Sequence, residues 1–251
     1  MDLGLRDRTY ILTGATGGLG LATAEALVAD GARVVVSSRT QASVDAAVAA
    51  LGDRATGVVA DNTDPSTPAR LVAAAQERFG RLDGALISVG GPPAGTVLDA
   101  TDEQWAEAFA TVFVGSLRLA RTIAAELGEG GSIAFVLSTS AKMPVSGLAI
   151  SNGLRPGLAM AAKTMADELG PRGVRVNGLL PGRLETARVQ HLDALADDPV
   201  AARAAHEAAI PLRRYGAPEE FGRVAAFVLS PAASFVTGTM LAVDGGLIRG
   251  L

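Results

Sequence analysis

The sequence contains no cysteine, and its charged residues form no block of one sign. The absence of cysteine excludes a disulfide. With a net charge of −4 and a pI near 5.3, neither a nucleic-acid footprint nor a patch for anionic membranes is supported. No uninterrupted apolar run reaches the ~18 residues of a membrane span, and residues 1–8 carry four charges. We therefore expect a cytoplasmic protein with no secretory signal and no metal, whose partner is a small molecule.

Hydrophobic residues make up 49% of the 251 positions, which is enough to bury one large core. No internal repeat or low-complexity linker divides the chain. We therefore expect one dinucleotide-binding domain over residues 1–251. Residues 185–210 are alanine-rich and broken by Pro199, and they interrupt the otherwise regular pattern. We expect this stretch to form a lid over the substrate.

A glycine-rich loop near the start of the chain follows a short apolar run at residues 10–12. From Leu19 the apolar period becomes helical, and it ends at Gly31. Gly14, Gly18 and Gly20 allow a sharp turn and a close approach to a diphosphate, which the unpaired N–H groups of a helix N-terminus would bind. We expect the loop to bind a dinucleotide through Gly14, Thr16, Gly18, Leu19 and Gly20. The alternative is a tight turn without a ligand.

Strand and helix patterns alternate along almost the whole chain. This alternation predicts an α/β fold, a doubly wound parallel sheet of about seven strands with helices on both faces. The expected strands are residues 10–12, 33–37, 55–60, 83–88, 132–137, 174–180 and 239–243. The expected helices are residues 19–31, 44–51, 65–79, 101–128, 150–169 and 219–229.

Polar residues follow the second and third expected strands. At the end of the second strand an acidic residue would accept a hydrogen bond from the 2′-hydroxyl of NAD. Ser38 and Arg39 stand there instead, and a guanidinium pairs well with a 2′-phosphate, so we expect NADP rather than NAD. Asp61 and Asn62 follow the third strand, where they would meet the adenine edge. The alternative for this pair is a cap on the following turn.

Taken together, the motifs resemble those of the short-chain dehydrogenase/reductase family along essentially the whole chain. The resemblance implies cofactor contacts from Gly90, Pro181, Gly182 and Thr186. The matching stretches are Thr-Gly-x-x-x-Gly-x-Gly at residues 13–20, Arg-Val-Asn at 175–177, Pro-Gly at 181–182, Ile-Pro-Leu at 210–212, Pro-Glu-Glu at 218–220 and Val-Asp-Gly-Gly at 243–246.

The catalytic positions depart from the family pattern. The family uses Ser, Tyr and Lys, the last two at Tyr-x-x-x-Lys spacing, with an Asn on the long helix. Here the serine position is Ser138, the tyrosine position Ser151, the lysine position Arg155 and the asparagine position Val112. An aliphatic hydroxyl is a poor proton donor beside a phenol, and a guanidinium does not give up its proton. The chain resembles a divergent branch with Ser-Asn-x-x-Arg and with Gly-Gly-Pro-Pro at residues 90–93.

Lys142 is one of two lysines, and it follows the fifth expected strand. We hypothesise that it supplies the missing cation and the proton, against the alternative of a solvated loop charge. His191 and His206 are further titratable candidates in the expected lid, where exposed helix residues are the commoner case. Arg183 follows Pro181-Gly182, so it either binds an acidic substrate group or lies on the surface.

The leading hypothesis is an NADP(H)-dependent oxidoreductase of a carbonyl or alcohol, similar to 3-oxoacyl reductases, in which Ser138 polarises the oxygen. The second is a nucleotide-binding homologue without hydride chemistry that acts as a sensor or as the partner of an active subunit. The third is an elimination in the same pocket. The apolar helices at residues 101–128 and 150–169 predict a homo-oligomer, a dimer or tetramer.

Overall fold

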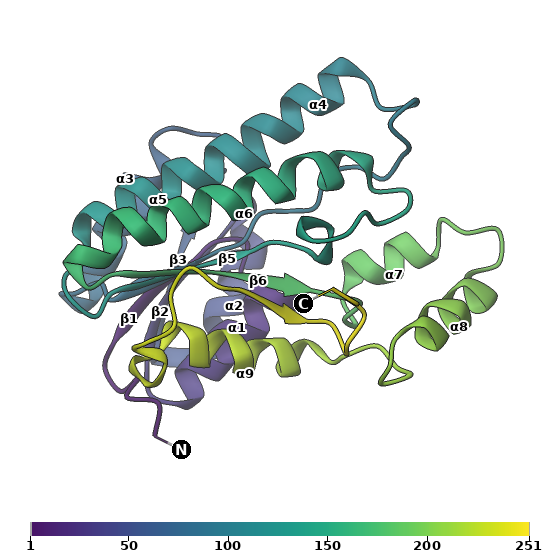
Figure 1. Cartoon of the computed structure of the whole chain (residues 1–251). Coiled ribbons are helices and arrows are strands. Elements are labelled where there is room, and N and C mark those ends of the chain that lie inside the picture. The colour runs from purple at the N-terminus through teal and green to yellow at the C-terminus, as the bar shows by residue number, and fades with distance from the viewer. Residues whose placement is uncertain (1, 251) are drawn as a thin grey trace.

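The structure is a computed structural model in which residues 2–250 are described. Seven strands form one parallel sheet in the order β3-β2-β1-β4-β5-β6-β7 (Figure 1). The predicted doubly wound α/β fold is confirmed. The strands are β1 (Thr9–Leu12), β2 (Arg33–Ser38), β3 (Ala55–Val59), β4 (Gly84–Ile87), β5 (Ser132–Val136), β6 (Arg175–Pro181) and β7 (Met240–Val243).

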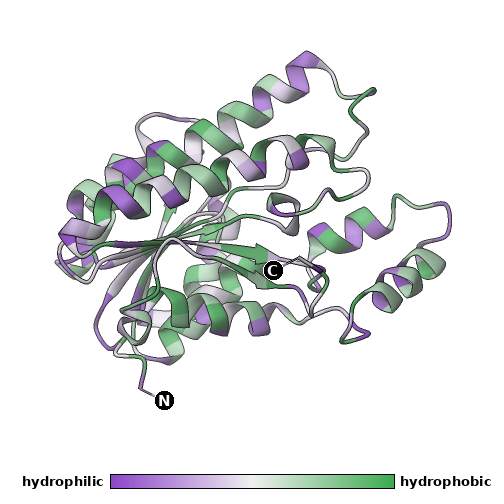
Figure 2. Ribbon diagram, viewed as in Figure 1, coloured by the Kyte–Doolittle hydropathy of each residue, from purple (hydrophilic) through white to green (hydrophobic). Residues whose placement is uncertain are grey.

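Helices cover both faces of the sheet, as parallel strands with apolar residues on both faces require (Figures 1 and 2). One face carries α1 (Gly18–Ala29), α2 (Gln41–Leu51) and α9 (Pro218–Leu229). The other carries α3 (Thr67–Phe79), α4 (Asp102–Ala108), α5 (Ser116–Glu126) and α6 (Ala149–Leu169). Short 3-10 turns are η1 (Gly52–Arg54), η3 (Thr139–Ala141), η4 (Gly170–Arg172) and η5 (Pro231–Ala233).

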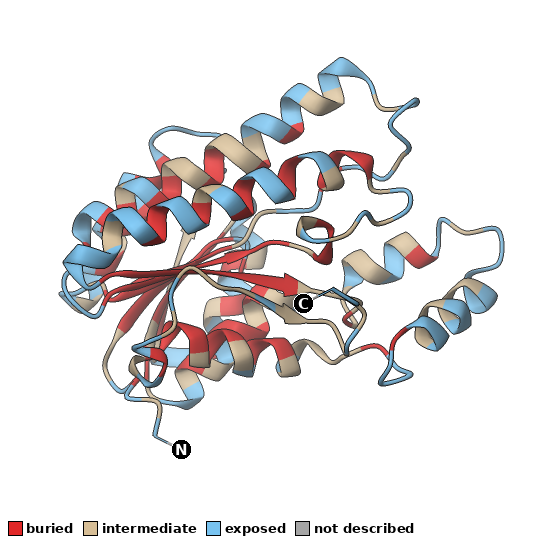
Figure 3. Ribbon diagram, viewed as in Figure 1, coloured by how far each residue is buried: buried red, intermediate tan, exposed pale blue. Residues whose placement is uncertain are grey.

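The buried side chains form two large cores, one on each side of the sheet (Figure 3). Ile11 and Phe135 point into the core under α3, α5 and α6, whereas Tyr10 and Leu12 point into the core under α1 and α9. The alternation follows from the period of two in a strand. The central strands β1, β4 and β5 are buried throughout, which fixes their register and the place where they end.

The predicted helix 101–128 consists of α4, a π-helical segment η2 (Phe109–Gly115) and α5, in one continuous rod. At Gly115 a Cβ atom would lie 2.7 Å from the carbonyl oxygen of Asn62, so the rod passes very close to the segment after β3. By length and hydropathy, Asp102–Glu126 would be able to cross a membrane, and 44% of its most apolar window is buried in the fold. Core helices meet the same criterion.

The expected lid forms two helices, α7 (Ala187–Asp193) and α8 (Pro199–Ala209). They lie beyond the carboxyl ends of β6 and β7 in Figure 1. Thr186 caps α7 by accepting from the Val189 N–H at 3.3 Å, and Asp198 caps α8. This excursion therefore lies at the edge of the sheet where ligands of open α/β folds bind.

Arg175, from the Arg-Val-Asn stretch, has a structural role. Its buried guanidinium donates to the carbonyl oxygens of Val228 at 2.8 Å, Leu229 at 3.2 Å and Ser230 at 2.9 Å. These carbonyls belong to the C-terminal end of α9, which leaves such groups without partners. Burial lowers the pKa of Arg175. The side chain thus joins the end of α9 to the start of β6.

We predict that Arg175→Met lowers the free energy of unfolding by about 3 kcal/mol, because the carbonyls of Val228 and Ser230 lose this donor while the Leu229 carbonyl keeps Ser132. The exposed Arg223 of α9 provides the control, and Arg223→Met should change stability by less than about 0.5 kcal/mol. Urea unfolding followed by circular dichroism measures both. Equal stability of the two variants would contradict the structural role of Arg175.

Candidate active site

The glycine loop between β1 and α1 lies at the carboxyl edge of the sheet. Thr13 ties the end of β1 to the end of β4: its hydroxyl donates to the Ser88 carbonyl at 2.7 Å and accepts from the Ser88 N–H at 2.9 Å. At Gly14 φ is +58° and a Cβ would lie 2.9 Å from the Ser88 carbonyl oxygen; at Gly20 it would lie 2.6 Å from the Gly14 carbonyl oxygen. Only glycine fits either position.

A cavity of about 470 Å³ opens over this loop. Helix α1 begins at the loop with no side-chain cap, so its first N–H groups are free to bind an anion. Thr186 lies over the opposite side, where a Cβ at Gly18 would be 3.5 Å from its methyl group. The diphosphate of a dinucleotide fits between the glycine loop with the free N-terminus of α1 on one side and Thr186 on the other.

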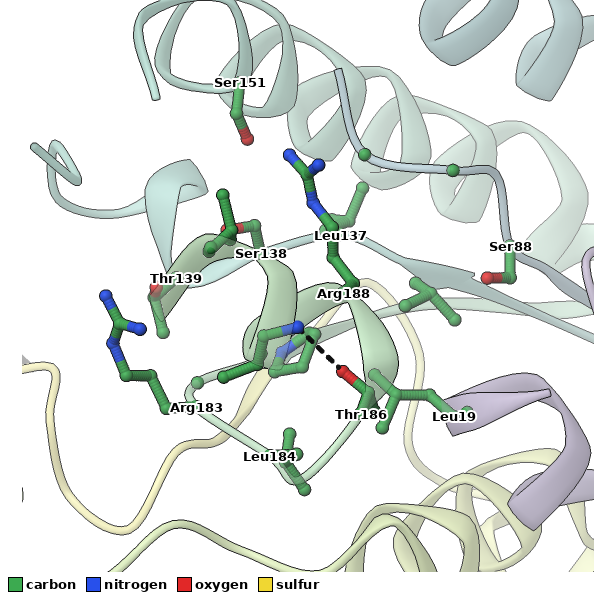
Figure 4. Close-up of a pocket in the computed structure, with 18 of the residues that line it drawn as sticks. Leu19, Ser88, Leu137, Ser138, Thr139, Ser151, Arg183, Leu184, Thr186 and Arg188 are labelled. Carbon is green, nitrogen blue, oxygen red and sulfur yellow. Dashed lines mark hydrogen bonds between the residues drawn. The ribbon is translucent and has the colours of Figure 1, made fainter. Parts of the chain in front are cut away.

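Eight of the residues predicted to bind the cofactor line this cavity: Gly14, Gly18, Leu19, Gly20, Gly90, Pro181, Gly182 and Thr186. Three of the predicted catalytic residues, Ser138, Ser151 and Arg155, line it as well (Figure 4). The sequence thus located the pocket from positions up to 172 residues apart in the chain, from Gly14 to Thr186.

Thr16, Ser38, Arg39, Asp61 and Asn62 do not line the cavity. A contact of Asp61 with the adenine edge stays a prediction. In the structure Asp61 closes the turn after β3, as its alternative describes, by accepting from the Thr63 N–H and hydroxyl, both at 2.8 Å. Those bonds lower its pKa, and nearby Arg39 adds to the shift. Ser38 and Arg39 end β2 at the same edge, with Arg39 exposed.

Three serines are linked by hydrogen bonds beside the cavity, one of them through the backbone of Ser140. The Ser138 Oγ accepts from the Ser140 N–H at 3.1 Å, and the Ser140 Oγ lies 2.9 Å from the Ser151 Oγ. Ser138 is half-buried, whereas Ser140 and Ser151 are buried. The Ser138 hydroxyl hydrogen has no acceptor among residues 2–250 and is free to point at a ligand oxygen.

Arg155 is a buried cation on the pocket wall, with 5% of its surface exposed. Its Nη1 donates to the Val136 carbonyl at 2.8 Å, whereas its Nε has no partner within the described part of the chain. Burial lowers the pKa of Arg155 to about 10. No carboxylate among the described residues pairs with it. A buried donor in this state suits a polar ligand such as ribose hydroxyls.

Lys142 is exposed and does not line the cavity, so the arrangement does not support its predicted role as a proton donor. His191 is exposed too. His206 is half-buried, and its Nε2 lies 2.8 Å from Nη2 of Arg183. Burial, with Arg183 second, lowers the pKa of His206. None of these three groups faces the cavity.

Arg183 is turned toward the lid. Its Nη1 donates to the Asp193 carboxylate at 2.6 Å, and the Tyr215 hydroxyl donates to the same carboxylate at 3.0 Å. Arg183 therefore anchors α7, and it is also among the residues that line the cavity (Figure 4). Neither described tyrosine replaces the missing phenol, because Tyr215 is held here and Tyr10 is buried under α9.

Sequence reasoning missed Arg188, which lines the cavity from the first turn of α7. Its position two residues after Thr186, at the start of the lid, was the available signal.

The family of the chain follows from comparison with known proteins. Residues 14–248 match the family model described as enoyl-(acyl carrier protein) reductase. The chain is 34% identical to the human dehydrogenase/reductase SDR family member 4, over 96% of this chain and 88% of that protein. The chain belongs to the short-chain dehydrogenase/reductase family.

Other members are similar along their whole length. An uncharacterized oxidoreductase of Mycobacterium tuberculosis is 38% identical over 97% of this chain and 93% of its own. A short-chain dehydrogenase/reductase of Brucella melitensis, titled glucose/ribitol dehydrogenase, superposes with a TM-score of 0.92 at 32% identity, covering both chains fully. L-Sorbose reductase from Gluconobacter frateurii, solved with NADPH and L-sorbose, gives 0.93 at 27% identity, again over both full chains.

The buried, unpaired state of Arg155 leads to a prediction with two opposite effects. Arg155→Met should raise the free energy of unfolding of the ligand-free short-chain dehydrogenase/reductase by about 1 kcal/mol, since an isosteric apolar side chain removes a desolvated charge. The same variant should bind a nicotinamide nucleotide about tenfold more weakly or worse, because a charge-assisted donor is lost. Thermal unfolding with and without nucleotide measures both effects. A variant that is less stable without ligand and binds normally would contradict the ligand-binding role.

Proposed function

We propose that the chain is an NADP(H)-dependent oxidoreductase acting on a carbonyl or alcohol with atypical catalytic residues. The observation that carries the proposal is the single cavity shared by the glycine loop, Thr186 and Ser138. A relative supports the reaction class: a Streptomyces virginiae protein assigned as the ketoacyl reductase of the monensin polyketide synthase is 35% identical, over 96% of this chain and 97% of its own. The structural neighbour solved with NADPH supports the cofactor.

The residues of the chain would divide the work as follows. The bound nicotinamide nucleotide supplies or accepts the hydride. The free helix terminus at Gly18 holds its diphosphate, and Arg155 donates to its ribose hydroxyls. The Ser138 hydroxyl donates a hydrogen bond to the substrate oxygen and stabilises the charge that develops there. The backbone N–H of Ser140 holds the Ser138 Oγ in place, and the Ser140 and Ser151 hydroxyls, which bond to each other, do not act as acids.

The proposal also includes a lid over the substrate, a cytoplasmic location and a homo-oligomer. Helices α7 and α8 lie where a lid over the substrate would lie, and exposed apolar residues Phe109 and Met160 on the α4–α6 side fit an interface between copies.

One observation favours the second function, a nucleotide-binding homologue without hydride chemistry. Among residues 2–250, the cavity lining contains serines, threonines and arginines but no aspartate, glutamate, histidine, tyrosine or lysine. General acid catalysis needs a group whose pKa lies near the working pH. The proton must therefore come from water or from the substrate itself, or hydride transfer does not occur.

Titration of the protein with NADPH and NADH, followed by absorbance with a panel of ketones, separates the two functions. Oxidation of NADPH that Ser138→Ala reduces at least about a hundredfold supports the oxidoreductase. Binding without oxidation across the panel supports the second function, and failure to bind either nucleotide contradicts both.

Arg39 should set the preference for NADPH. Arg39→Ala is expected to weaken NADPH binding about tenfold or more through loss of the 2′-phosphate contact, with NADH binding changed less than twofold. Arg223→Met is the control for charge alone. Isothermal titration measures the affinities, and an equal loss for the two nucleotides would contradict a specific phosphate contact.

The pH profile tests the proton source. Because no pocket side chain titrates near neutrality, kcat between about pH 5.5 and 9 should show no inflection of the kind that a tyrosine or histidine acid gives. Initial rates at saturating NADPH and ketone measure it. A bell-shaped profile that persists in Lys142→Ala and His206→Gln would show that a protein acid has been overlooked.

A further inference from the structure

Arg188 extends from the first turn of α7 across the cavity (Figure 4). Its side chain points toward Ser151 on α6 and the segment after β4, and its Nη2 donates to the Pro92 carbonyl at 2.6 Å. The residue is half-buried. A guanidinium from the lid thus reaches the wall opposite the helix from which it comes.

The Gly-Gly-Pro-Pro segment at residues 90–93 is shaped around this side chain. A Cβ atom at Gly91 would lie 3.1 Å from Nε of Arg188 and 3.4 Å from its Cζ, so a side chain there would press on the guanidinium. Pro92 supplies the carbonyl that accepts from it. The unusual loop after β4 therefore makes room for a cation in the pocket.

Arg188 differs from its neighbours on the lid in having no counter-charge. Arg183 pairs with Asp193, and Arg203 pairs with Glu185 and Glu207. Within residues 2–250 no carboxylate pairs with Arg188, and none lines the cavity. Partial burial lowers the pKa of Arg188 because the charge has lost water without gaining an anion. Arg155 also lines the cavity without a carboxylate partner among the described residues, and burial lowers its pKa as well.

We infer that Arg188 binds an anionic group on the substrate, so that the pocket selects carbonyl compounds carrying a carboxylate or a phosphate. This inference rests on the proposed oxidoreductase function. The bond to Pro92 uses one of the two hydrogens on Nη2, and Nε and Nη1 make no hydrogen bond to any residue that the structure describes. The second Nη2 hydrogen therefore forms a bidentate edge with Nε or with Nη1, and this edge fits an anion. Serines 138 and 151 lie on the same cavity wall, within reach of the carbonyl end of a small substrate.

Two other roles make different predictions. If Arg188 only fastens the lid to the loop after β4, its loss affects charged and neutral substrates alike. If it binds a phosphate of the cofactor, its loss weakens NADPH binding. The experiment therefore measures the activity on charged substrates, the activity on neutral substrates and, by titration, the affinity for NADPH.

The experiment compares substrates that differ only in charge. Acetoacetate is paired with ethyl acetoacetate for the carboxylate, and dihydroxyacetone phosphate with dihydroxyacetone for the phosphate. For wild type, Arg188→Met, Arg188→Lys and the control Arg223→Met, kcat/KM is measured with NADPH. The thermal shift that each probe produces on the NADPH-bound protein is measured in parallel, since it requires no turnover.

The wild-type enzyme should prefer the anionic member of at least one pair by about tenfold or more, the effect of one charge-assisted contact. Arg188→Met should abolish the preference through KM, Arg188→Lys should restore part of it, and NADPH affinity should stay within twofold in both. The pair that shows the effect identifies carboxylate or phosphate.

The inference is overturned if the wild type gives equal kcat/KM values and equal thermal shifts with the charged and the neutral member of each pair. The absence of a thermal shift from every probe counts as this outcome. An equal loss on both members of a pair in Arg188→Met, or a loss of NADPH affinity, also overturns it. Failure of the wild type to bind NADPH, by contrast, overturns the proposed function itself. Anion-dependent thermal shifts without oxidation of NADPH leave the anion site in place and remove only the redox step.

Discussion

All seven strands are parallel, so their carboxyl ends meet at one edge, and the candidate site lies there. The constraint on this edge is the close contact between the ends of β1 and β4, where Thr13 and Ser88 exchange hydrogen bonds and Gly14 is too close to the Ser88 carbonyl for any side chain. This contact positions the loop that leads into α1. The scaffold does not depend on the identity of the side chains above the edge, so the fold accommodates Ser151, Arg155 and Val112 where the sequence predicts the tyrosine, lysine and asparagine of the family.

Two cations determine the charge balance of the pocket. Arg155 lines it as a buried guanidinium that stays protonated at all working pH values, and the hydroxyl of Ser151 adds no charge. Arg188 adds a second cation to the lining. Two desolvated guanidinium groups without carboxylates are costly in the empty protein, and an anionic ligand recovers that free energy on binding. Stability and ligand affinity are thus opposed at this site.

The fold was predictable from the sequence because the hydrophobic periods of strands and helices alternate cleanly. Several helix boundaries and the roles of several site residues depend instead on side-chain contacts, which the hydrophobic pattern does not show. Helix α2 begins at Gln41 rather than near Val44 because Thr40 accepts from the Ser43 N–H. The glycine loop and Ser138 were found because their spacing is local. Arg188 was not found, since the direction of its side chain depends on where α7 packs. The predicted role of Lys142 is not supported because the turn after β5 leaves this side chain in solvent.

The serines at residues 138, 140 and 151 bear directly on how a reduction would proceed. The Ser138 Oγ is held by the backbone N–H of Ser140, and the Ser140 and Ser151 hydroxyls bond to each other, so no chain of hydroxyls among these three carries a proton to Ser138. An aliphatic hydroxyl is a very weak acid, so Ser138 orients and polarises the substrate without protonating it. An alkoxide formed in the pocket would be held by Ser138 and by the field of two guanidinium groups until water protonates it. An anionic substituent on the substrate would neutralise one of those cations before the reaction begins. The field left for the alkoxide would then come chiefly from Arg155, so this residue would contribute a buried charge to the reaction and no proton.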